Sequence, residues 1–143
     1  MRVCLDANVL ISYLLRYTPH RPPSRIVDDA FAQRFDLIMS ELTPIELRAA
    51  VESKSYLSKH INLEDLEDFI LSMEFAATIV PKTDEQIPSA TRDPGDDYLI
   101  AHSILNDVDF LVTGDKDLLV LGKVAGVRIV SPATFLALLD DLP

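Results

Sequence analysis

The chain has 143 residues, of which 48% are hydrophobic, so it is long enough to bury one core as a single domain over residues 1–143. A lone cysteine excludes an intrachain disulfide. No uncharged apolar run approaches the roughly 20 residues that are needed to span a bilayer, so we expect a cytoplasmic protein with no membrane association. The formal net charge of −10 argues against tight nonspecific binding to nucleic acid, which usually requires a basic surface.

The N-terminal half of the chain is predicted to alternate strands and helices. Arg2 to Leu5 is apolar and short, as expected for a buried strand, and Asn8 to Tyr17 has the apolar spacing of a helix. After a proline-rich break, Ser24 is expected to cap a helix that ends near Gln33. The elements that follow are a strand at Asp36 to Met39, a helix from about Thr43, and an amphipathic helix at Asn62 to Ala76 with Leu63, Leu66, Phe69, Ile70 and Met73 on its apolar face.

The C-terminal half continues the alternation after an irregular stretch that contains Pro81, Pro88 and Pro94. The predicted strands are Ala77 to Val80, Phe110 to Thr113 and Val127 to Val130. The predicted helices are Asp96 to Asn106, Asp117 to Leu121 and Pro132 to Leu139. Strands that alternate with helices indicate an α/β fold, in which helices cover both faces of a mostly parallel sheet.

Several carboxylates fall where the predicted strands end or where the next helices begin. Asp6 directly follows the first strand, Asp115 follows the strand at 110–113 after a single glycine, and Glu46 lies on the first turn of the helix after the second strand. Asp96 and Asp97 open a later helix. Ligands of open parallel sheets bind beyond the carboxyl ends of the strands, so we expect these acids to share one cleft if the first and fourth strands are neighbours.

Each acid also has an ordinary structural explanation. Glu46 matches a capping box with Thr43, and Asp96, Asp97 and Asp115 could stabilise the N-termini of their helices. Asp6 is harder to explain in this way, because it interrupts the most apolar part of the chain, where an uncompensated charge is costly.

A cluster of these acids requires a counter-charge. Two carboxylates about 5 Å apart repel by roughly 3 kcal/mol at an effective dielectric constant of about 20. Carboxylates without histidine or cysteine at ligand spacing favour Mg²⁺ or Mn²⁺ over Zn²⁺. His102 is interpreted as a helix residue near the site rather than a ligand.

Four segments of the chain resemble the PIN-domain nucleases, and among them the VapC-like toxins of toxin–antitoxin pairs. These segments are Leu5 to Ser12, Ser40 to Leu47, Arg92 to Asp97 and Val112 to Leu119. The resemblance implies a three-layer PIN-like fold with a metal site. The metal ligands that it implies are Asp6, Glu46, Asp97 and Asp115, with Asp96 as the alternative to Asp97, Asp117 as a weaker fifth candidate, and Asn8 and Thr113 as polar supports.

The same resemblance implies a reaction and partners. The reaction is hydrolysis of phosphodiesters in single-stranded RNA with one or two Mg²⁺ or Mn²⁺ ions. A small basic antitoxin and a second copy of the chain are the expected protein partners. Four cationic residues could contact the phosphates of the substrate: Arg48, Lys54, Arg92 and Lys116. Each of them is alternatively an ordinary surface charge.

Two other functions stay open at this point. One is a PIN-like module that binds RNA or protein without cleaving it. The other is a phosphatase with Asp6 as nucleophile, although Asp6-Ala7-Asn8 lacks the second aspartate of one such class.

Overall fold

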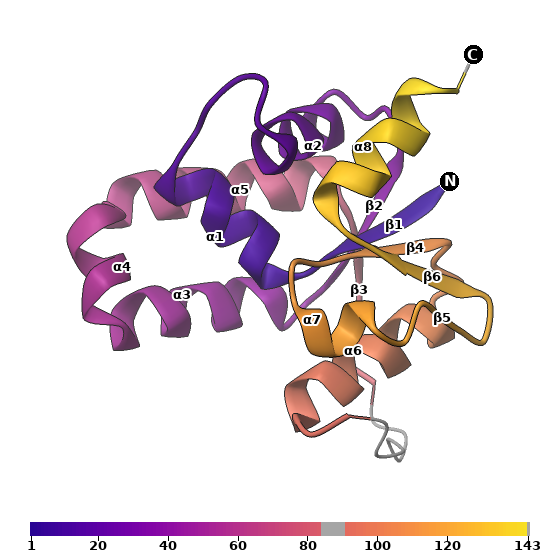
Figure 1. The fold of residues 1–143 in the computed structure, drawn as a ribbon. Helices are drawn as coiled ribbons and strands as arrows, with labels where there is room; N and C mark the ends of the chain where they lie inside the picture. Colours follow the sequence, from indigo (N-terminus) through magenta and orange to yellow (C-terminus); the bar gives the residue numbers. More distant parts are fainter. Residues whose placement is uncertain (84–90, 143) are drawn as a thin grey trace.

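The structure is a computed structural model that describes residues 1–83 and 91–142, so Pro88 lies outside the described residues. A sheet lies at its centre with helices on either side (Figure 1). The strands are β1 (Arg2–Leu5), β2 (Asp36–Ser40), β3 (Thr78–Val80), β4 (Phe110–Val112), β5 (Lys123–Val124) and β6 (Val127–Val130). The helices are α1 (Ala7–Leu15), α2 (Pro22–Phe31), α3 (Thr43–Ser53), α4 (Ser55–His60), α5 (Leu63–Ala76), α6 (Pro94–Leu105), α7 (Lys116–Leu119) and α8 (Pro132–Asp140).

The six strands are ordered β3-β2-β1-β4-β6-β5. Strands β3, β2, β1, β4 and β6 are parallel to their neighbours, and only the short edge strand β5 runs antiparallel, against β6. The predicted α/β fold with a mostly parallel sheet is therefore confirmed. In particular, β1 and β4 are neighbours, with Leu5 opposite Val112.

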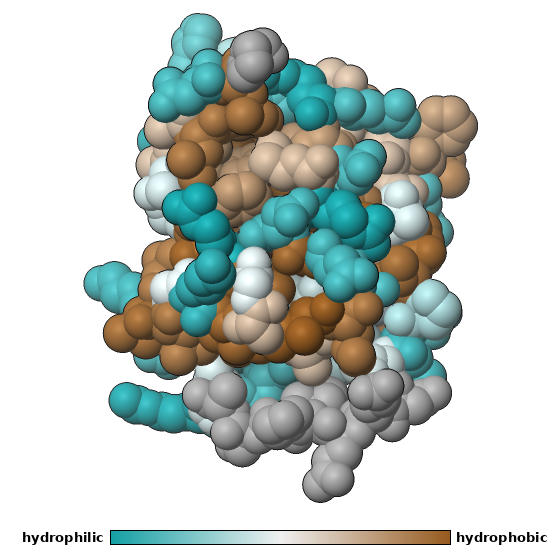
Figure 2. All heavy atoms as spheres, turned by 90° about the vertical axis from the view of Figure 1, so that its right-hand side faces the viewer, coloured by the Kyte–Doolittle hydropathy of each residue, from teal (hydrophilic) through white to brown (hydrophobic). Residues whose placement is uncertain are grey.

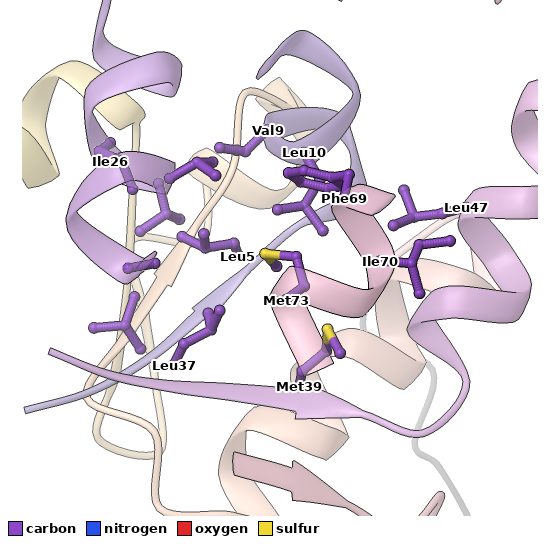
Figure 3. Packing of buried hydrophobic residues seen from close by; sticks show 14 of the residues in the cluster. Leu5, Val9, Leu10, Ile26, Leu37, Met39, Leu47, Phe69, Ile70 and Met73 are labelled. Carbon is purple, nitrogen blue, oxygen red and sulfur yellow. The ribbon is translucent and has the colours of Figure 1, made fainter. Parts of the chain in front are cut away.

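Both faces of the sheet are buried, because successive strand side chains point to opposite faces. Val3 and Leu5 enter a large core with α1, α2, α3, α4, α5 and α8, whereas Cys4 enters a smaller core with α6 and α7. Figure 3 shows Phe69, Ile70 and Met73 of α5 in the large core. Leu63 does not join them, contrary to the prediction, because its side chain lies at the first residue of α5 and is 70% exposed.

Some boundaries differ from the predicted ones for local reasons. Helix α1 ends at Leu15 rather than Tyr17. Helix α2 begins at Pro22, and Ser24 is buried inside it, where its hydroxyl accepts a hydrogen bond from the Thr18 amide instead of capping the helix. Helix α4 and strand β5, which have six and two residues, were not predicted from the sequence.

None of the helices in the described part of the chain is long and apolar enough to cross a membrane. Figure 2 views the side of the molecule that lies on the right in Figure 1, where the N-terminal end of β1 is located, and hydrophobic and hydrophilic residues are intermixed on it. The carboxyl ends of the parallel strands point the other way, and Asp6 and Asp115 follow β1 and β4 there.

Candidate functional site

The strand order places a crevice between the carboxyl ends of β1 and β4. From β1 the chain continues to β2 and β3 on one side of the sheet, and it then returns to β4 and β6 on the other side. Ligands of open α/β sheets bind at such a reversal of strand order. Asp6 leaves β1 at this crevice, and its amide donates to the Val112 carbonyl of β4 at 2.9 Å.

A polar network holds the Asp6 carboxylate. The buried Thr113 hydroxyl donates to Asp6 Oδ2 at 2.8 Å, and Asn8 Nδ2 donates to the same oxygen at 3.2 Å. The Asp115 amide in turn donates to Thr113 Oγ1 at 3.0 Å, and the Gly114 amide donates to Asn8 Oδ1 at 3.3 Å. Asn8 and Thr113, expected as polar supports, thus contact Asp6 directly and connect it to the loop that carries Asp115.

Asp115 caps α7, as its ordinary interpretation predicts. Its Oδ1 accepts the Asp117 amide at 2.9 Å, which fixes the carboxylate at the mouth of the crevice. Asp117 itself is exposed, and none of the described contacts joins its carboxylate to Asp6 or Asp115.

The first turn of α6 orients its two acids differently. Asp97 is buried, and its Oδ1 accepts hydrogen bonds from the Thr91 amide at 2.7 Å and the Thr91 hydroxyl at 2.9 Å. Asp96 instead lies beside Asp115. Burial, the Asp115 carboxylate within hydrogen-bonding reach, and the charges of Asp93 and Asp6 raise the pKa of Asp96 to about 7. Asp96, the alternative, therefore lines the cleft beside Asp115, whereas the carboxylate of Asp97 is bonded to Thr91.

Glu46 does not form the capping box that the sequence suggests. Leu42 is the N-cap of α3 without a side-chain capping bond, and the Leu42 amide donates to Ser40 Oγ at 3.1 Å. Thr43 already lies within the helix. Partial burial and the negative charge of Asp6 raise the pKa of Glu46. The Glu46 carboxylate is therefore close enough to the crevice to interact with the charge of Asp6.

The crevice continues into a cleft of about 230 Å³ whose lining includes Asp6, Glu46 and Asp96. Ser40 and Tyr98 also line it, and their hydroxyls are 3.3 Å apart. Neither residue was a candidate site residue on the basis of the sequence. Their positions, at the end of β2 and on the first turns of α6, are the only signal that could have indicated them. His102 lies on α6 beside the site as expected, buried and stacked on Tyr98.

Within the described residues, no ion pair joins a lysine, arginine or histidine to Asp6, Glu46, Asp96 or Asp115. The ion pairs found there join Arg25 or Arg34 to Asp29, Arg25 to Asp140, and Arg48 to Glu67. Burial is the largest cause that raises the pKa of Asp6, with the charge of Asp115 adding to it. Within residues 1–83 and 91–142, no three acidic, histidine or cysteine side chains stand close enough to hold one ion without moving.

The predicted phosphate-contacting cations differ in their surroundings. Arg48 binds both oxygens of Glu67, at 2.7 and 3.0 Å, so its ordinary interpretation as a surface charge is the better one. Arg92 is exposed two residues before α6 begins, and Lys116 is the exposed first residue of α7. Lys54 lies in a separate groove, next to α4.

A comparison with protein-family profiles matches residues 2–117 to the family described as PIN domain. The chain belongs to the PIN domain family. The match includes Asp6, Glu46, Asp96, Asp97 and Asp115.

A solved structure shares this PIN fold: the crystal structure of VapBC2 from Rickettsia felis bound to a DNA fragment from their promoter. It aligns with 92% of this chain and 98% of that chain at 14% sequence identity, with a TM-score of 0.59. At this identity the likeness shows a common fold. No curated protein matches the sequence significantly.

Proposed function

We propose that this PIN domain is an endoribonuclease that hydrolyses single-stranded RNA with Mg²⁺ or Mn²⁺. Asp6, Asp96 and Asp115 are the proposed metal ligands, and Glu46 is a further ligand or the group that orients the attacking water. The observation that carries the proposal is the gathering of these acids at the β1–β4 crevice without a described lysine or arginine to neutralise them.

The donor set fits a hard divalent cation. Carboxylate oxygens are the ligands that Mg²⁺ and Mn²⁺ prefer. In the metal-free protein the pKa of Asp96 is raised to about 7, because burial and the charges of Asp115, Asp93 and Asp6 disfavour its ionised form. A cation at the crevice would remove this repulsion, and binding it requires the side chains to move closer together.

A bound divalent cation lowers the pKa of a coordinated water and stabilises the charge that develops on the phosphate. The protein's own residues hold the geometry. Thr113 and Asn8 fix Asp6, the amide of Asp117 fixes Asp115, and Glu46 lines the same cleft as Asp6. The raised pKa of Glu46 moves it toward the range that suits a general base at neutral pH. Positive charge from the cation also allows an acidic cleft to accept a polyanion.

The two alternatives make different demands on the site. A silent binding module has no use for a group of carboxylates that destabilise one another, so their proximity supports catalysis. A phosphatase would form a phosphoryl bond to Asp6, and a trapped aspartyl-phosphate would support it over the nuclease.

The proposal is tested with purified protein, separated from any partner, and a labelled single-stranded RNA. We expect cleavage with Mg²⁺ or Mn²⁺, none with excess EDTA, and recovery when the cation is restored. Cleavage that survives chelation would contradict the metal mechanism, and intact RNA under every cation tested would favour the silent module.

As a toxin of a toxin–antitoxin pair, the protein is proposed to be cytoplasmic and to bind a small basic antitoxin and a second copy of itself. The net charge of −10 suits a basic partner, and the exposed apolar side chains Leu71 and Phe75 on α5 suit a protein interface. We expect a dimer by light scattering at micromolar concentration and a small basic protein in pull-downs from the native host. A monomer without a partner would count against both interactions.

A further inference from the structure

A basic groove of about 490 Å³ lies beside the carboxylate site. We call it the α1–α4 groove; its lining consists of Asn8, Ile11, Ser12, Leu15, Arg16, Arg21, Lys54, Tyr56 and Leu57. Three of these side chains are cationic, and none of the described residues that line the groove is acidic. The chain as a whole has a net charge of −10, whereas the charged side chains that line this groove are all positive.

The groove adjoins the crevice through a shared residue. Asn8 lines the groove, and it also donates to the Asp6 carboxylate at 3.2 Å. The lining follows α1 from Asn8 to Arg16 just beyond its C-terminal end, and it also includes Tyr56 and Leu57 of the first turn of α4. A polymer that lies in the groove would therefore pass next to the carboxylates.

The cations of the groove are available for a ligand. Arg25, Arg34 and Arg48 form ion pairs with carboxylates. None of the ion pairs within residues 1–83 and 91–142 includes Arg16, Arg21 or Lys54.

Arg21 is held in position by the end of α1. Its Nη1 donates to the Ser12 carbonyl at 3.4 Å and to the Arg16 carbonyl at 3.2 Å. A cation is favourable at this end of a helix, where the carbonyls are unsatisfied. The guanidinium has five N–H donors, so these two contacts leave others for a phosphate.

An exposed aromatic side chain lies next to these cations. Tyr56 is 63% exposed, and its ring lies 4.4 Å from that of His60, which supports it from one side. Basic side chains that follow a backbone, together with an exposed aromatic ring on which a base can stack, are the usual elements of a single-strand binding surface.

We propose that the α1–α4 groove binds the single-stranded substrate on one side of the scissile phosphodiester. Arg16, Arg21 and Lys54 contact its phosphates, and Tyr56 stacks on a base. This inference rests on the proposed ribonuclease function. It also resolves the conflict between an acidic chain and a nucleic-acid substrate, because the positive charge is concentrated where the strand lies.

The test is fluorescence anisotropy of a labelled oligoribonucleotide in EDTA, where binding is measured without cleavage. The Arg16→Ala/Lys54→Ala variant should bind at least about 10-fold more weakly, and its slope of log affinity against log salt should be smaller by about 1.4, since each lost phosphate contact removes about 0.7. Tyr56→Leu should weaken binding at least about 5-fold through lost stacking.

Matched controls separate the groove from general charge and from folding. Lys123→Ala/Arg128→Ala removes the same two residue types from exposed positions on β5 and β6 and should leave RNA affinity unchanged. The Arg16→Lys/Lys54→Arg variant keeps both charges and should retain binding, which shows that charge rather than packing is required.

An oligodeoxyribonucleotide of the same sequence should compete for the groove, because phosphate and stacking contacts do not require a 2′-hydroxyl. RNA affinity that is equal in parent and Arg16→Ala/Lys54→Ala, or RNA binding for which this DNA fails to compete, would overturn the inference. Binding in EDTA does not depend on cleavage. If the parent cleaves RNA and Arg16→Ala/Lys54→Ala binds RNA normally, only the proposal about the groove is refuted. If the parent binds RNA through the groove but cleaves it with no cation tested, only the proposed ribonuclease function is refuted.

Discussion

Replacement of Asp6 by asparagine is expected to reduce RNA cleavage at least about 100-fold and to leave the protein folded. A loss of this size is typical when a preorganised electrostatic group is removed from an active site. Asparagine keeps the shape of the side chain, and its carbonyl oxygen can still accept from Thr113 and Asn8, which donate to Asp6 in the parent. The negative charge that would bind a cation is lost. Cleavage rates measured together with circular dichroism check both halves of the expectation.

The same variant should be more stable than the parent in metal-free buffer, by about 1 kcal/mol after allowance for solvent screening, or about 3 °C in melting temperature. Burial and Asp115 raise the pKa of Asp6, so its charged form destabilises the folded state. Asp96 has a folded pKa of about 7 against an ordinary 3.8, so its destabilisation of the folded state is absent below the lower value, grows as the pH rises through that window, and is complete above about pH 7.

The gain in stability should therefore be larger at about pH 8 than at about pH 5, because more of the neighbouring carboxylates are ionised at the higher pH. Adding Mg²⁺ should raise the melting temperature of the parent more than that of the variant, since a ligand stabilises the state that binds it. A metal-free Asp6→Asn variant that melts well below the parent would mean that Asp6 is a structural acid.

Asp96→Asn and Asp97→Asn form a matched pair on adjacent positions of α6, and they should have opposite effects. Asp96→Asn should lower cleavage at least about 30-fold with unchanged or higher stability, because it removes a proposed ligand and one member of a repulsive pair. Asp97→Asn should retain cleavage within a few-fold. Its stability should fall by about 1 to 2 kcal/mol, because an amide oxygen is a weaker acceptor for the two hydrogen bonds from Thr91.

Cleavage assays and thermal melts of the two proteins measure these effects side by side. If Asp97→Asn were inactive with an unchanged melting temperature, and Asp96→Asn fully active, Asp97 would be the ligand and the orientation of the first turn of α6 would have to change on metal binding.

The location of the candidate acids in the fold could be predicted from sequence, because strand ends and helix starts fix where they lie along the chain. Asp6 and Asp115 follow β1 and β4 directly, and the pairing of these strands brings the two residues to one crevice. The choice between Asp96 and Asp97 could not be made in this way. It depends on the phase of α6, which Asp93 fixes by accepting the Gly95 amide, and consecutive positions on a helix differ by about 100°.

Local contacts with no sequence signature account for the other differences. The capping box at Thr43 was a reasonable prediction, but Ser40 accepts the Leu42 amide and the helix begins one residue earlier than that pattern requires. Strand β5 has two residues, and its turn to β6 places Ala125 and Gly126 at φ values of 48° and 90°. Such turns are usually marked by Asn-Gly or Asp-Gly, and Ala-Gly is a weak signal.

The α1–α4 groove is an example of a feature that only the fold reveals. Lys54 is far from Arg16 and Arg21 in the sequence, and the three residues meet because α1 packs near α3 and the start of α4. Lys54 was a candidate phosphate contact from its sequence position, whereas Arg16 and Arg21 were not.

The most direct test of the central claim, that these carboxylates form a divalent-cation site, is a titration with Mn²⁺ followed by electron paramagnetic resonance. We expect the parent to bind Mn²⁺ and Asp6→Asn and Asp96→Asn to bind it at least about 10-fold more weakly. Glu46→Gln distinguishes a ligand, which would weaken binding, from a base, which would lower cleavage alone. Glu52→Gln, an exposed acid on the same helix, should bind Mn²⁺ as the parent does. A parent that binds no Mn²⁺, or an Asp6→Asn/Asp96→Asn protein that binds it with unchanged affinity, would contradict the account.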